Sequence, residues 1–193
     1  MKFLRFSALI SLLISFPALA HEEGVGHAGF LVGLLHPALG LDHLLAMLSV
    51  GILSAQIGGR AMWSVPLTFV VVMTIGSIMG GHNIPIPLVE SGIALSVIAL
   101  GIALAADKNM AIAWAMLFVS FFAIFHGHAH GTEMPDVGNP ITYGIGFILG
   151  TAIIHLAGVL VGVISKRIPK GPVLLRVSGA AIAIIGVTML VGL

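Results

Sequence analysis

The sequence contains no cysteine among its 193 residues, and only 8% of its residues are charged. Without cysteine the chain has no disulfide bond, no thiolate metal ligand and no cysteine nucleophile. Soluble domains carry roughly 25% charged residues, whereas 59% of this chain is hydrophobic. A soluble fold is therefore excluded, and metal chemistry must use histidine, carboxylate, methionine or backbone oxygen atoms.

The few charges are balanced, which removes another class of partner. The formal net charge is +1, and no run of basic residues is present. Proteins that bind nucleic acid concentrate positive charge on one face or segment. We therefore expect no nucleic-acid partner, and the length favours one compact unit.

The N-terminus has the pattern of a secretory signal peptide. Positive charges at Lys2 and Arg5 precede an apolar run over 7–16, and the Ala-Leu-Ala sequence ending at Ala20 fits a cleavage site. The alternative is an uncleaved first transmembrane helix, for which this apolar run is short. The predicted domains are a signal peptide (1–20) and a membrane domain (21–193).

Six apolar runs in the remaining chain are each long enough to cross a bilayer. A hydrocarbon core needs about 20 apolar residues in an α helix, and glycine, proline and charged residues separate the runs. We therefore predict an all-α integral membrane protein with six transmembrane helices after a cleaved signal peptide. The expected spans are 29–55, 61–81, 87–106, 110–128, 141–165 and 172–192.

Charged residues between the runs predict the orientation of the helices. When the loops are assigned alternately to two sides, the basic residues after the signal peptide share one side: Arg60, Lys108, Lys166, Arg167, Lys170 and Arg176. The positive-inside rule makes that side cytoplasmic. Acidic residues gather on the opposite side: Glu22, Glu23, Glu90, Glu133 and Asp136. Both termini of the mature chain are therefore expected outside the cytoplasm.

Nine histidines are unusual in so apolar a chain, and ionisable groups inside a membrane are costly and functional by default. At about 1.5 Å per residue, His36 lies roughly 10 Å below the outer surface, and His43 lies near the middle of the membrane. Together the candidate ligands form a series from the outer surface to the middle of the membrane: His36, Asp42, His43, His126, His130, Glu133 and His155.

The spacing within the first span supports a shared site. His36 and His43 are seven residues apart, so a continuous helix would place them on one face to within about 20°. Pro37 and Gly40 interrupt this run, and such breaks free backbone carbonyls to line a polar site. Imidazole with carboxylate and no thiolate suits nickel, cobalt or zinc better than calcium or magnesium.

Some histidines have a simpler interpretation. A lone histidine inside a membrane, such as His82 or His155, is also explained by a hydrogen bond between helices. His21, His27 and His128 could collect metal near the surface without being needed for its passage. An isolated buried carboxylate is expensive unless it has a partner, so Asp42 next to His43 is harder to explain structurally.

Two segments resemble the signatures of a known family. The sequence HPALGLDH at 36–43 resembles the H-P-x-x-G-x-D-H signature in the first helix of the HupE/UreJ family. The sequence FHGHAHGTE at 125–133 resembles the F-H-G-x-A-H-G-x-E signature in that family's fourth helix. The resemblance covers essentially the whole chain, and it implies a permease of the bacterial inner membrane for nickel or cobalt. Such permeases supply hydrogenase, urease or cobalamin synthesis.

The resemblance also implies the residues of transport, position by position: His36, Asp42, His43, His126, His130 and Glu133. His128 stands at a variable position of the signature. To this set we add His155 at mid-depth and His21, whose free α-amino group after cleavage would chelate metal at the outer mouth. The expected substrate is Ni²⁺ or Co²⁺, with no permanent cofactor, and the expected partners are this ion and the lipid bilayer.

Two other classes of function remain open from the sequence. An intramembrane zinc hydrolase also uses His and Asp from several helices, and a haem-binding cytochrome uses histidine pairs on facing helices. Carboxylates among the candidate ligands argue against haem, and an open series of ligands argues against a closed catalytic centre. We therefore expect a transporter and no enzyme activity, while the choice of metal, proton coupling and oligomeric state stay undecided.

Overall fold

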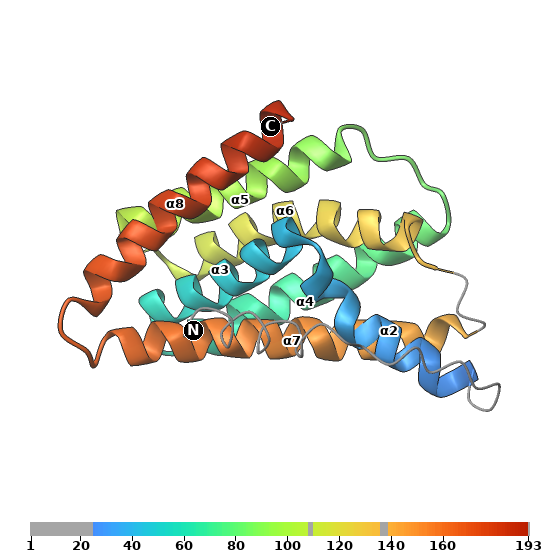
Figure 1. Cartoon of the computed structure of the whole chain (residues 1–193), viewed down its shortest axis with the longest axis horizontal. Coiled ribbons are helices and arrows are strands. Elements are labelled where there is room, and N and C mark those ends of the chain that lie inside the picture. Colours follow the sequence, from blue (N-terminus) through green and yellow to red (C-terminus); the bar gives the residue numbers. More distant parts are fainter. Residues whose placement is uncertain (1–24, 108–109, 136–138, 193) are drawn as a thin grey trace, which may run out of the picture.

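The computed structural model describes residues 25–107, 110–135 and 139–192, which form a bundle of α helices (Figure 1). In chain order the helices are α2 (Val25–Leu39), α3 (Leu41–Ile57), α4 (Ala61–Gly81), α5 (Val89–Ala106), α6 (Ile112–Thr132), α7 (Pro140–Ser165) and α8 (Gly171–Val191). The predicted signal peptide and His21 lie outside the described residues.

Five of the helices, α4 to α8, are long and apolar enough to cross a membrane. Helices α2 and α3 pass the same test together, as one span that is bent by 82°. The described part of the chain is therefore all-helical with five membrane-spanning helices, or six when the bent pair counts as one span. α6 continues to Thr132, beyond the predicted end at residue 128.

The first span is broken at Gly40, as Pro37 and Gly40 together predict. Gly40 has φ −87° and ψ 122°, an extended conformation that separates the two helices. Pro37 contributes because its nitrogen has no hydrogen to donate to the carbonyl one turn earlier. The prediction that His36 and His43 share one helical face is therefore wrong, since it assumed a continuous helix through both residues.

The helices pack most extensively in three pairings. α4 packs on α6, α5 packs on α8, and α7 packs on both α2 and α3. Counted as spans, the first contacts the fifth, the second contacts the fourth, and the third contacts the sixth. When spans one, two and three are exchanged with spans four, five and six, the same three pairs result. Two three-helix halves with inverted topology would also produce this pairing.

Glycine allows α4 and α6 to approach closely. A Cβ atom added at Gly127 would meet the backbone carbonyl of Met73, and one at Gly131 would meet that of Ser77. Small residues are the usual means by which transmembrane helices bring their backbones together. Gly127 and Gly131 therefore mark a close contact between the two helices.

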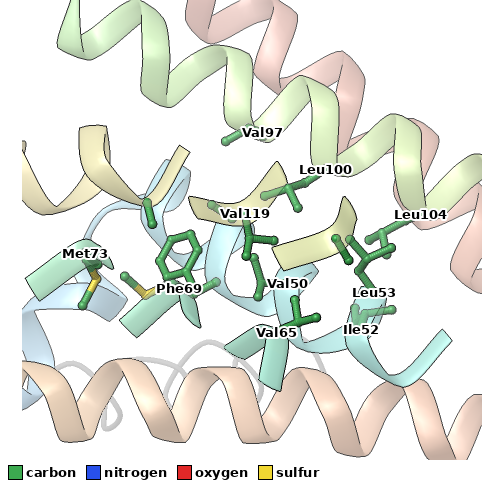
Figure 2. Close-up of a cluster of buried hydrophobic side chains, with 14 of the residues drawn as sticks. Val50, Ile52, Leu53, Val65, Phe69, Met73, Val97, Leu100, Leu104 and Val119 are labelled. Atoms are coloured by element: carbon green, nitrogen blue, oxygen red, sulfur yellow. The ribbon is translucent and has the colours of Figure 1, made fainter. Parts of the chain in front are cut away.

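Apolar side chains fill the space between α3, α4, α5 and α6 (Figure 2). Phe69 of α4 is fully buried there with Val50, Val97 and Val119 from the other three helices. In contrast, Trp63 is 69% exposed, on the surface expected to contact lipid. Because lipid tails are as apolar as these side chains, close packing has to hold the centre together.

Basic side chains gather at one end of the bundle. Lys166, just after α7, donates to the carbonyl oxygens of Ala55 at 2.7 Å and Gln56 at 3.2 Å, in the last turn of α3. Arg176 of α8 donates to the carbonyl oxygen of Ala105 at 2.9 Å, in the last turn of α5. These cations bind the negative ends of two helix dipoles. The cytoplasmic orientation of this end stays a prediction.

Candidate metal-binding site

A cavity of ≈320 Å³ lies at the end of the bundle opposite these cations. Because this end is predicted to face outward, the cavity is called the outer cavity. It is formed where the break at Gly40 meets the first turn of α5 and the last turn of α6. Its ionisable lining consists of His36, Asp42, His43, Glu90, His130 and Glu133. Five of the predicted ligands therefore share one cavity, although they come from different parts of the chain.

Asp42 and His43 form a coupled pair at the start of α3. The Oδ1 atom of Asp42 accepts hydrogen bonds from the backbone nitrogen of His43 and from its Nδ1, each at 2.8 Å. Since a carboxylate accepts, Nδ1 carries the hydrogen and the lone pair of the neutral ring is on Nε2. This Nε2 atom is buried, with no hydrogen-bond partner among the described residues.

Four histidine rings form a row along α2, α3 and α6. The ring centre of His130 lies 4.9 Å from that of His36 and 4.1 Å from that of His43. The ring of His43 in turn lies 4.7 Å from that of His126. Both ring nitrogens of His130 are buried without partners in the described part of the chain. The row therefore presents several unused nitrogen atoms within an apolar bundle.

His126 is the most deeply buried member of this row. It is 0% exposed, and its Nε2 lies 2.7 Å from the Oγ atom of Ser96 on α5. The rings of His126 and Phe69 are centred 5.8 Å apart. His126 does not line the outer cavity, but its ring lies against that of His43, which does.

His155 lies apart from the outer cavity. Its ring centre is 5.2 Å from that of Phe69, the same aromatic ring that contacts His126. Both ring nitrogens of His155 are buried and lack partners among the described residues. It also lines an apolar cavity of ≈400 Å³ between α4 and α7. The predicted ligands thus form two groups, the row with its cavity and His155 by itself. The ring of Phe69 lies next to a member of each group.

Two histidines outside the row have other environments. Nε2 of His128 lies 2.8 Å from the carbonyl oxygen of Ile84 and must donate to it, since a carbonyl only accepts. His128 therefore ties the end of α6 to the segment before α5. His82 is exposed after the end of α4 and lines a different cavity of ≈460 Å³. His21, the remaining predicted ligand, lies outside the described residues.

Glu90 and Ser96 were not among the predicted ligands, yet both touch the site. Glu90, in the first turn of α5, lines the outer cavity and also a smaller one of ≈130 Å³, which it shares with Asp42. Its place among the outer acids was a weak signal for this position. Ser96 had no signal in the sequence, because its contact with His126 depends on how α5 packs against α6.

In this conformation the row is not a closed metal cage. Within the described ranges, no three His, Asp or Glu side chains are arranged so that they could hold one ion together. The contacts occur instead between neighbours: His36 with His130, His130 with His43, and His43 with His126. Ligands in such an order can hold an ion at successive positions.

The apolar spans and the buried polar row define this chain as a multi-pass membrane protein with ionisable groups in its interior. The chain belongs to the HupE/UreJ family, because the sequence model described as HupE / UreJ protein matches residues 9–189. It is 41% identical over 194 residues to Protein HupE of Rhizobium leguminosarum bv. viciae, and the match covers 100% of both chains. No solved structure matches this chain.

Proposed function

We propose that this protein takes up nickel or cobalt across the bacterial inner membrane, with the metal passing along the row of histidines. The observation that carries this proposal is the row itself: four histidine rings at centre distances of 4.1 to 4.9 Å within an apolar bundle. Buried nitrogen atoms without partners are expensive in hydrocarbon. A divalent cation that binds imidazole and carboxylate would satisfy them in turn.

The cavity at the break in the first span is the entrance in this proposal. Glu90 and Glu133 attract the hydrated ion, and Asp42 with the neighbouring histidines replaces its water. The ion then moves from His130 to His43 and His126, each step joining rings that already contact each other. His155 receives the ion next, after it passes the ring of Phe69.

The distribution of charge favours inward movement. The acids Glu90 and Glu133 lie at the cavity end, whereas Lys166 and Arg176 lie at the other end of the bundle. By the positive-inside rule the cationic end faces the cytoplasm. A metal ion from outside therefore meets ligands first, while one from the cytoplasm meets positive charge.

The membrane potential supplies enough energy for this transport. The sequence has no G-x-x-x-x-G-K phosphate loop that would indicate ATP use. A divalent ion that crosses roughly 100 mV gains about 2 × 2.3, or about 4.6 kcal/mol. This energy corresponds to roughly 10³-fold accumulation. In this proposal, uptake therefore needs no ATP hydrolysis.

Metal accumulation by cells that express single variants tests this proposal. We expect His130→Ala to lower the accumulation of nickel or cobalt at low external metal at least 10-fold, because the row loses the ring that joins its outer and inner parts. His82→Ala is the matched control, since this histidine is exposed and lies outside the row. Equal accumulation by His130→Ala and the wild type, at equal protein levels, would refute passage along the row.

A further inference from the structure

One hydroxyl group on the buried side of α5 contacts the innermost histidine of the row. Ser96 is 0% exposed, and its Oγ atom lies 2.7 Å from Nε2 of His126. The same Oγ lies 2.7 Å from the backbone carbonyl oxygen of Ile93 and donates to it. Ser96 does not line the outer cavity. Its connection to that cavity is therefore indirect, through the imidazole of His126.

The two hydrogen bonds of Ser96 fix which nitrogen of His126 carries the hydrogen. A hydroxyl has one hydrogen to donate, and a carbonyl oxygen can only accept. Both 2.7 Å contacts can be hydrogen bonds at the same time only when the hydroxyl donates to Ile93 and the Nε2 atom of His126 donates its own hydrogen to Ser96. The lone pair of the neutral imidazole is then on Nδ1, since the two ring nitrogens take opposite roles. Nδ1 is buried without a partner in the described residues.

We propose that Ser96 is a positioning residue that holds His126 in its Nε2–H form, so that Nδ1 is available to bind the metal that leaves His43. This inference rests on the proposed transport function. Histidines that bind metal commonly donate their other ring hydrogen to a nearby group that fixes the tautomer and the ring orientation.

The last two rings of the row, those of His43 and His126, are held in the same way from different helices. Asp42 accepts from Nδ1 of His43 and leaves Nε2 unused, whereas Ser96 accepts from Nε2 of His126 and leaves Nδ1 unused. The ring centres of His43 and His126 lie 4.7 Å apart. Two adjacent rings thus each have a lone pair available, and Ser96 contributes to the row without being a ligand itself.

The chain contains a matched control for the serine itself. Ser54 on α3 is also 0% exposed, and its Oγ donates to the carbonyl oxygen of Gly51 at 2.7 Å. It therefore makes the same bond to the residue three positions earlier, but within the described residues its hydroxyl makes no hydrogen bond to a histidine ring. Ser54→Ala removes an equivalent hydroxyl, so it measures the purely structural cost of such a change.

The ring form of His126 is measured directly by ¹⁵N NMR on the metal-free, full-length protein with labelled histidine. The His126 signals are assigned as those lost in His126→Ala. We expect protonated Nε2 and unprotonated Nδ1 in the wild type and in Ser54→Ala, and a mixture of both tautomers in Ser96→Ala. An unchanged His126 spectrum in Ser96→Ala would overturn the inference, whether or not the protein transports metal.

Binding of Ni²⁺ and Co²⁺ by the purified protein supplies the second measurement. We expect Ser96→Ala to raise the Kd about 10- to 100-fold, the usual effect of losing a group that orients a metal-binding histidine, while Ser54→Ala stays near the wild type. In a His126→Ala background Ser96→Ala should have no further effect, because it acts through that ring.

The outcomes separate this inference from the proposed function. Equal losses in Ser96→Ala and Ser54→Ala, or a full additional loss in the double variant, would contradict a positioning role. If the wild type bound neither metal, the proposed function would fail. The tautomer measurement would in that case still decide whether Ser96 sets the form of His126.

Discussion

Asp42 affects the site through its neighbour as well as through its own charge. One oxygen atom, Oδ1, accepts both the backbone and the ring hydrogen of His43. This arrangement fixes the tautomer and orientation of the ring and leaves Nε2 as the atom that would bind the proposed metal. The carboxylate also lines both the outer cavity and the smaller cavity beside it. Removal of the Asp42 carboxylate should therefore disturb two candidate ligands, the carboxylate itself and the imidazole of His43.

His128 provides a test of which histidines are structural. We expect His128→Ala to lower the stability by about 1 kcal/mol or more, because the bond to the carbonyl oxygen of Ile84 is lost. Metal affinity should stay unchanged, since this ring is outside the row. His128→Gln keeps an amide hydrogen that can donate to Ile84 and should restore stability in thermal unfolding. A marked loss of metal affinity in both variants would show that His128 is a ligand.

Residue patterns predict membership of the site better than they predict its contacts. The segments at 36–43 and 125–133 supply five of the six ionisable residues that line the outer cavity. Spacing along a helix gives the depth of a residue and its angle relative to others on that helix, but not which neighbouring helix it faces. The sequence therefore did not reveal that Phe69 lies near both His126 and His155. Glu90 and Ser96 were missed because their positions depend on how α5 packs.

At the scale of the helix, the break between α2 and α3 forms one wall of the outer cavity. The bend of 82° ends α2 after His36 and begins α3 just before Asp42. A straight helix would bury these residues along one side, as the seven-residue spacing predicted. The break instead brings the end of one helix and the start of the next to the same cavity.

A methyl group at the break should disturb the site and preserve the fold. A Cβ atom at Gly40 would lie 2.8 Å from Oδ1 of Asp42 and 3.1 Å from Nδ1 of His43. The φ angle of −87° at this position is accessible to alanine. We therefore expect Gly40→Ala to fold normally and to bind Ni²⁺ or Co²⁺ about 10- to 100-fold more weakly.

Isothermal titration of purified Gly40→Ala with each metal provides the measurement. Gly144→Ala is the control, because a Cβ atom there would have no other atom within 4 Å. An affinity for Gly40→Ala equal to that of the wild type would mean that the contact between Asp42 and His43 does not contribute to binding.

The contact between α4 and α6 should be sensitive to single carbon atoms. A methyl group at Gly127 would meet the backbone carbonyl of Met73, and a backbone cannot move aside as a flexible side chain can. Overpacking of this kind typically costs about 1–3 kcal/mol, so Gly127→Ala should unfold at a clearly lower temperature. Gly144→Ala should match the wild type in the same melting assay. Equal melting of both variants would disprove the close contact.

Helix positions were largely predictable, whereas helix pairing was not. Long apolar runs with few charges fix where a transmembrane helix lies, and α4 matches its predicted span of 61–81. The turn at Gly40 was expected from Pro37, but its angle was not, because tertiary packing sets the angle. The pairing of helices depends on contacts between segments, such as that of Gly127 with α4. The sequence of one segment alone does not specify such a contact.

At the scale of the whole molecule, charge and polarity are arranged in one direction. Acids and histidines surround the cavity at one end, and the caps formed by Lys166 and Arg176 lie at the other. Between them Phe69 and other fully buried apolar side chains fill the bundle (Figure 2). In the proposed uptake, a metal ion would therefore pass the histidine row first and these apolar side chains next.

The most direct test of this account is metal uptake into proteoliposomes under an imposed inside-negative potential. Nickel, cobalt and zinc are compared for the wild type and for Asp42→Ala. The account predicts saturable uptake of nickel or cobalt that grows with the potential and falls at least 10-fold in Asp42→Ala. Tight binding of these metals by the wild type without entry of any of them would contradict transport and would favour an intramembrane metalloenzyme.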